Sequence, residues 1–144
     1  MKFEGELQVP FPSDKLWSFI TDVEKVASCF PGLKSITKTG ENTYAVVGTA
    51  GIGFIKGEYK ANVQLSNIDQ NSKSLNLLAK GTGLNSNLDI TALVQLLESP
   101  VRLKYSADVK VSGVLASIGA RLMDSALNKL LNELFECIKL KAAN

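Results

Sequence analysis

The chain of 144 residues contains no histidine. This absence excludes Ser-His-Asp and Cys-His catalysis and any histidine-ligated metal, so a general acid or base would have to be a carboxylate, lysine, tyrosine or cysteine. No run reaches the roughly 18 apolar residues of a membrane-spanning helix, and we expect no signal peptide in Met1-Lys2-Phe3-Glu4. A net charge of +2, with both signs interspersed, argues against binding to nucleic acid.

Cysteine is scarce as well. Cys29 and Cys137 lie far apart and fit no metal-ligand spacing, so we expect two reduced thiols in a cytoplasmic protein, with Cys29 buried and unreactive. No metal site, no cofactor and no catalytic residue is predicted. A chain of this length can bury a sizeable core without a metal or a disulfide, and we expect one domain over residues 1–144.

The C-terminal segment from Gly113 to Lys141 has the clearest pattern in the sequence. Apolar residues recur every three or four positions, and no proline interrupts them, which predicts one helix about 40 Å long. Its wide apolar stripe consists of Leu115, Ile118, Leu122, Ala126, Leu130, Leu134 and Ile138, with Met123, Leu127, Leu131 and Phe135 beside them. Such a helix needs a large apolar surface to cover.

The preceding residues alternate between apolar and polar side chains, which predicts strands with one buried face. We expect strands at 2–9, 33–38, 43–49, 54–68, 75–81, 88–96 and 101–111. Two short helices follow the first strand, one capped by Ser13 and one opened by a capping box at 21–24. Short connections make the strands antiparallel, so the fold class is α+β, with one sheet face covered by the C-terminal helix.

Several segments carry a resemblance to a known family. They are residues 1–6 with Val9-Pro10, 16–22, 29–33, 56–57, 103–109 and, most specifically, 113–122. The chain resembles the helix-grip fold of the START-like and polyketide-cyclase (SRPBCC) superfamily, and within it the family of the carbon monoxide dehydrogenase G subunit. This resemblance implies a curved seven-stranded antiparallel sheet around the long helix, with a cavity between them.

The resemblance also implies a function. The family is an accessory component of molybdenum-containing carbon monoxide dehydrogenases and related hydroxylases, which implies membrane recruitment of the enzyme or handling of a quinone. We therefore expect a non-enzyme that binds a hydrophobic molecule such as a quinone or lipid, in the cytoplasm or peripherally at the inner face of the membrane. The alternatives are a cyclase- or hydrolase-type enzyme using Tyr59 or Tyr105 as acid, and an interaction module with a filled core.

The candidate site is the cavity between the sheet and the helix. Small inward residues would leave space that the helix does not fill; they are Gly57, Ala61, Ala79, Gly81, Ala92 and Ala107. The predicted lining is Tyr59, Leu77, Leu88, Ile90, Tyr105, Leu122, Met123, Ala126 and Leu127. The two tyrosines would supply the sparse polar groups typical of a pocket for a lipophilic molecule. The alternative is an ordinary packed core.

A second candidate is the entrance loop, formed by Gly51, Ile52, Gly53 and Phe54. Its glycines are typical of a phosphate-binding loop, but this segment joins two strands and lacks the Gly-Lys-Ser/Thr ending, which argues against a nucleotide. Apolar residues are unusual in a turn. We predict a mobile lip at the cavity entrance that touches the membrane or a partner; the alternative is a bent strand whose apolar residues fold inward.

Overall fold

The computed structural model describes residues 1–143. The elements follow the order expected from the sequence: one strand, two short helices, six strands and a long helix. Their bounds are β1 (Lys2–Gln8), α1 (Ser13–Ile20), α2 (Val23–Ala27), β2 (Leu33–Gly40), β3 (Thr43–Ile52), β4 (Ile55–Asp69), β5 (Ser74–Gly83), β6 (Ser86–Leu97), β7 (Arg102–Gly113), the 3₁₀ helix η1 (Val114–Ile118) and α3 (Ala120–Ala142).

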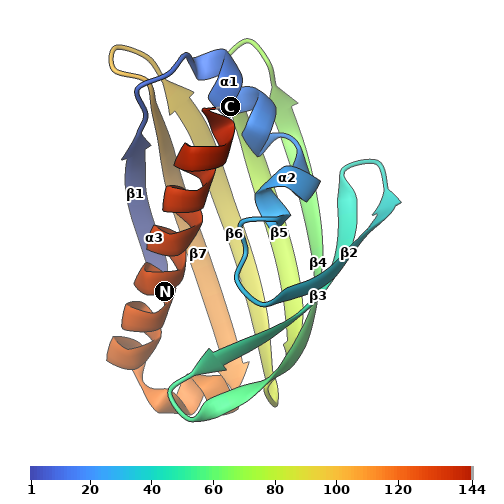
Figure 1. Ribbon diagram of the computed structural model, residues 1–144. Helices are drawn as coiled ribbons and strands as arrows, with labels where there is room; N and C mark the ends of the chain where they lie inside the picture. Colours follow the sequence, from blue (N-terminus) through green and yellow to red (C-terminus); the bar gives the residue numbers. More distant parts are fainter. Residues whose placement is uncertain (144) are drawn as a thin grey trace.

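The seven strands form one antiparallel sheet in the order β1-β7-β6-β5-β4-β3-β2. The sheet curves around α3, and α1 and α2 cross one end of it, since they connect the edge strand β1 to the opposite edge strand β2 (Figure 1). The predicted helix-grip fold is therefore confirmed. The two helices between β1 and β2 are called the insert below.

The alternation in the sequence matches the two faces of the sheet. In β4 the even positions from Lys56 to Gln64 are exposed, whereas the odd positions from Gly57 to Val63 are at least partly covered. Because side chains of a strand point to opposite faces in turn, the odd set faces α3 and the even set faces solvent.

The buried core lies mainly at the insert end of the molecule. Leu16 of α1 is fully buried, with Trp17 and Phe19 nearly so, and all three pack with the last turns of α3. The apolar cluster also contains Leu7, Val9, Cys29, Leu65, Leu75, Leu96, Leu103, Ile138 and Ala142. The insert and the end of α3 thus close one end of the sheet with a hydrophobic plug.

The predicted single helix from Gly113 to Lys141 is wrong at its start. The chain first forms η1, and Gly119 then separates this turn from α3. Gly113 and Gly119 adopt φ values of 90° and 94°, which favour glycine and interrupt a right-handed helix. The backbone N–H of Leu115 donates to Ser86 Oγ at 2.9 Å, so η1 is held to the start of β6 and cannot continue along the axis of α3.

The prediction of two reduced thiols is also wrong. Cys29 and Cys137 form a disulfide whose Cα atoms lie 5.5 Å apart, although 108 residues separate them along the chain. Cys29 follows α2, and Cys137 lies on α3. The fold brings the insert against the last turns of the helix, and this proximity could not be read from the spacing of the cysteines.

The start of α1 differs from the expected cap. The N-cap residue is Pro12, and Ser13 is the first helical residue. The Ser13 hydroxyl instead donates to a carboxylate oxygen of Glu98 and accepts from Lys73 Nζ at 2.9 Å. Ser13 therefore ties α1 to the β4–β5 and β6–β7 hairpin regions. The second helix is capped by Asp22, whose carboxylate accepts from the backbone N–H of Lys25 at 3.3 Å.

Candidate functional site

The inner face of the sheet is apolar but only half-buried. Among the described residues of β4 to β7, none of the alternate positions that face α3 carries a charged side chain. Small residues lie on this face: Gly81 pairs with Leu88, Ala79 pairs with Ile90, and Ala92 pairs with Leu77 on one side and with the equally small Ala107 on the other. Because these positions keep partial exposure, α3 does not seal the middle of the sheet as it seals the insert end.

The predicted lining residues occupy this face and the helix above it. Leu77, Leu88, Ile90, Ala126 and Leu127 are half-buried. Met123 is buried, with 4% of its surface exposed, whereas Leu122 is 43% exposed. An enclosed cavity between these residues stays a prediction.

Tyr59 and Tyr105 each lie beside a glycine on the neighbouring strand. Tyr59 is paired with Gly48, and a Cβ at Gly48 would lie 2.6 Å from the Tyr59 Oη. Tyr105 is paired with Gly5 in the same way, with its Oη 2.7 Å from an added Cβ. Each ring thus lies across its glycine. A tyrosine whose cross-strand partner is a glycine would have predicted this packing, but the partner can be identified only when the register of the strands is known.

The environment of the two tyrosines keeps their hydroxyls protonated. Burial raises the pKa of Tyr59 and of Tyr105 above the ordinary value of 10.0. The Tyr105 ring also contacts Phe135 of α3, with ring centroids 5.3 Å apart. Neither hydroxyl has a hydrogen-bond partner among the residues that the structure describes. Each can therefore donate to an acceptor atom of a bound molecule.

The entrance loop is the tip of the β3–β4 hairpin, where Ile52 pairs with Ile55 around Gly53 and Phe54. Gly53 has a φ of 63°, and Phe54 is 89% exposed. A Cβ at Gly53 would lie 3.6 Å from Leu122 Cδ2, so the tip touches the beginning of α3. Ile52 and Ile55 are half-buried, which leaves Phe54 as the projecting side chain. That the tip moves stays a prediction.

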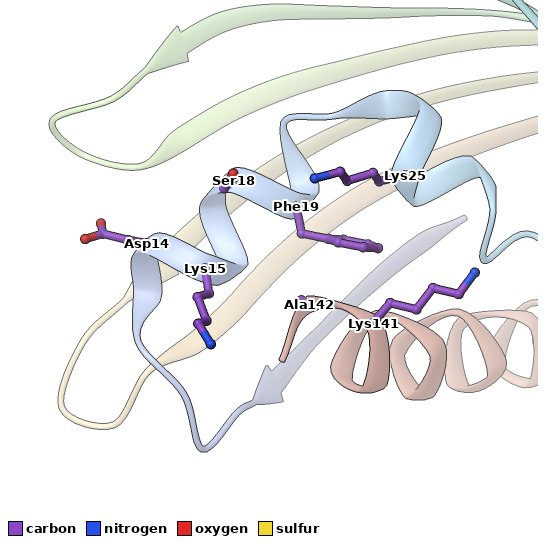
Figure 2. Close-up of a pocket in the computed structure, with 7 residues that line it drawn as sticks. All are labelled: Asp14, Lys15, Ser18, Phe19, Lys25, Lys141 and Ala142. Atoms are coloured by element: carbon purple, nitrogen blue, oxygen red, sulfur yellow. The ribbon is translucent and has the colours of Figure 1, made fainter. Parts of the chain in front are cut away.

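A hollow that the sequence did not predict lies between the insert and the end of α3. Its volume is about 440 Å³, and it is lined by Asp14, Lys15, Ser18, Phe19, Lys25, Lys141 and Ala142 (Figure 2). Two of its lysines bind helix ends: Lys15 Nζ donates to Ala143 O at 3.1 Å, and Lys141 Nζ donates to Ser28 Oγ at 3.0 Å. These contacts place positive charge at the carbonyl ends of α3 and α2, where the helix dipoles favour it.

A second hollow, of about 460 Å³, lies on the sheet and is lined largely by residues of its outer face. Leu78 and Leu93 contribute exposed apolar surface there, and Ser66, Asn76, Thr91 and Ser106 surround them with polar groups. No group of His, Cys, Asp or Glu residues that could hold a metal ion occurs among the described residues. In the same part of the chain, no helix is both long and apolar enough to cross a membrane.

Solved structures with the same architecture show the fold class. The chain superimposes on a conserved protein from Geobacillus kaustophilus with a TM-score of 0.92 and 24% identity, covering 99% of this chain and 95% of that one. A START superfamily protein from Mycobacterium smegmatis gives 0.73 at 10% identity, with coverage of 99% and 97%. The Zhui aromatase/cyclase from Streptomyces sp. R1128 gives 0.71 at 12% identity, with coverage of 99% and 93%. The fold is thus START-like.

The family follows from the sequence itself. The family model of the carbon monoxide dehydrogenase G subunit (CoxG) matches residues 5–143, so the chain belongs to this family. No protein of curated function matches the sequence.

Proposed function

We propose that the protein binds a hydrophobic small molecule, such as a quinone or lipid, between the inner face of the sheet and α3. The observation that carries this proposal is the half-buried, uncharged inner face, where Gly81, Ala79 and Ala92 alternate with larger apolar residues. An apolar surface left partly open to water gains about 25 cal/mol per Å² when a ligand covers it. Tyr59 and Tyr105 would supply donors to an acceptor atom on that ligand.

We further propose that the protein serves a carbon monoxide dehydrogenase or a related molybdenum hydroxylase as a non-catalytic accessory protein. Membership of the CoxG family supports this partner. The inner register of β4 to β7 pairs no carboxylate with Tyr59 or Tyr105, which favours a carrier over an acid–base enzyme. The protein would act in the cytoplasm or peripherally at the inner membrane face, with Phe54 making transient contact with the bilayer.

Overpacking the inner face tests the binding site. Ala92→Leu adds a larger side chain at a half-buried position beside Leu77 and Ala107. We expect it to weaken the binding of a short-chain benzoquinone or naphthoquinone at least about tenfold, while the thermal midpoint stays near that of the wild type. Quenching of Trp17, which is the sole tryptophan, and native mass spectrometry would measure binding.

Thr91→Leu is the matched control, because it places the same side chain on the outer face of the same strand. It should leave the affinity unchanged. Equal affinity of the Ala92→Leu variant and the wild type would contradict the proposed site. Loss of folding in that variant would show that the space is already filled, as in an interaction module with a packed core.

A further inference from the structure

The long helix is held mainly at its two ends. Of the 23 residues of α3, the buried ones are Met123 near its start and Ile138 and Ala142 near its end. The residues between them that face the sheet are half-buried. A helix with so little buried surface along its middle gains little stability from packing there, so its position depends on the two end contacts.

At the C-terminal end, the disulfide is the strongest single constraint. Apart from the apolar plug, the end of α3 contacts the insert through Lys141 Nζ, which donates to Ser28, and Ala143 O, which accepts from Lys15. Both contacts are exposed, and exposed polar contacts contribute little to stability. The Cys29–Cys137 bond joins the insert and α3 covalently, and its two cysteines are 108 residues apart in sequence.

The position of this bond couples it to the inner face. The insert and the last turns of α3 together close one end of the sheet (Figure 1). They can part only if the bond between them is broken, and parting would uncover the inner face from that end. Cys29 is 7% exposed and Cys137 is the more accessible residue, so we expect an attacking thiolate to reach the Cys137 sulfur.

We propose that the Cys29–Cys137 disulfide is a redox latch that fixes α3 against the insert, and that its reduction speeds the exchange of the apolar ligand. The second part rests on the proposed function. A dithiol reductant attacks Cys137 Sγ to form a mixed disulfide and releases the Cys29 thiolate. Its second thiol then displaces Cys137. The reductant loses two electrons and becomes a disulfide, and its two thiol protons pass to the two cysteines.

The chemistry of disulfides supports a switch. In the cytoplasmic location proposed above, glutathione keeps thiols reduced, and the disulfides that occur there are usually transient, catalytic or redox-sensing. Lys141 Nζ donates to Ser28 Oγ at 3.0 Å, and Ser28 directly precedes Cys29, so a positive charge lies near the bond and favours the approach of an anionic thiolate.

The test compares oxidised protein, protein reduced with dithiothreitol, and the Cys29→Ala/Cys137→Ala variant. A thiol reagent should count no free thiols in the oxidised protein and two in the reduced protein. Amide hydrogen exchange at 134–142 and 13–29 should be at least about tenfold faster in the reduced protein and in the variant than in the oxidised protein. Release of a bound naphthoquinone, followed by stopped-flow fluorescence of Trp17, should accelerate by a similar factor.

Lys141→Ala is the matched control, because it removes the polar contact with Ser28 and keeps the disulfide. Measured on oxidised protein, where no thiolate is involved, it should leave the rates of hydrogen exchange and of ligand release near those of the oxidised wild type. Two free thiols in protein prepared without reductant, or equal hydrogen exchange in both redox states, would overturn the latch. Saturable quinone binding with equal release rates in both redox states would overturn only the effect of reduction on ligand exchange. No saturable binding in either state would overturn the proposed function and that effect with it.

Discussion

The exposed tip of the β3–β4 hairpin leads to a prediction that can be worked out in numbers. Phe54 is 89% exposed, so Phe54→Ser removes almost no buried surface. We expect the free energy of unfolding to change by less than about 0.5 kcal/mol, as is usual for surface substitutions. If Phe54 enters the bilayer during loading, the same change removes the transfer of one aromatic side chain, worth about 1.5–3 kcal/mol. Association with vesicles should then fall by roughly 10- to 100-fold.

The assay uses vesicles that contain a quinone, with vesicle flotation to measure association and stopped-flow fluorescence to measure transfer. A double variant that combines Ile52→Ser with Phe54→Ser should show a modest further loss of stability, because Ile52 is half-buried and pairs with Ile55. Leu93→Ser is the control: Leu93 is 49% exposed on the outer face of β6, and β5 separates this strand from the β3–β4 hairpin. If Phe54→Ser is folded and both associates and transfers as the wild type does, the ligand enters elsewhere. If it unfolds, Phe54 belongs to the core.

Two further predictions concern the tyrosines. Gly48→Ala places a Cβ 2.6 Å from Tyr59 Oη and 2.9 Å from the Gly32 carbonyl oxygen, so the free energy of unfolding in urea should fall by about 1–3 kcal/mol. Gly81→Ala, whose nearest contacts are at 3.6 Å, should lower it by less than half as much. Equal losses would refute the packing of the Tyr59 ring against Gly48. Because burial raises the pKa of Tyr59, the folded state holds that proton more tightly, and stability present below pH 10.0 should be lost as pH rises through the folded pKa. Tyr59→Phe should flatten this alkaline decline between about pH 9 and 12, and an unchanged slope would assign the decline to other groups.

The sheet was predictable because its signal is local. Alternation along β4 to β7 identified the inner face, and short connections identified antiparallel pairing, so the order of elements and a sheet covered by the last helix followed, whereas the helix-grip fold came from the resemblance to a known family. The apolar stripe of α3 was likewise visible, since a helix repeats its contacts every three or four residues. These features depend on neighbours in sequence, which a single chain displays directly.

The features that were missed depend on residues far apart in sequence. Ser13 looked like a cap, but its hydroxyl is taken by Glu98 and Lys73. The two cysteines looked unrelated until the insert was placed against α3. The hollow between the insert and α3 joins residues 14–25 with 141–142, and no local pattern connects them. Gly119 was the exception, because a glycine at a helix start was a local signal for the break.

The pairing of β1 with β7 has a consequence for how the chain is made. Lys2 to Gln8 lie against Arg102 to Asp108, so the first strand leaves the ribosome about 100 residues before its partner. At about 5–20 residues per second, β1 waits for roughly 5–20 s without a strand beside it. Its apolar side chains, Phe3 and Leu7, are exposed during that interval. Cys29 is made 108 residues before Cys137, so the interval before the disulfide can form is slightly longer. The nascent chain therefore passes through a stage in which chaperone binding at the N-terminus would protect it from aggregation.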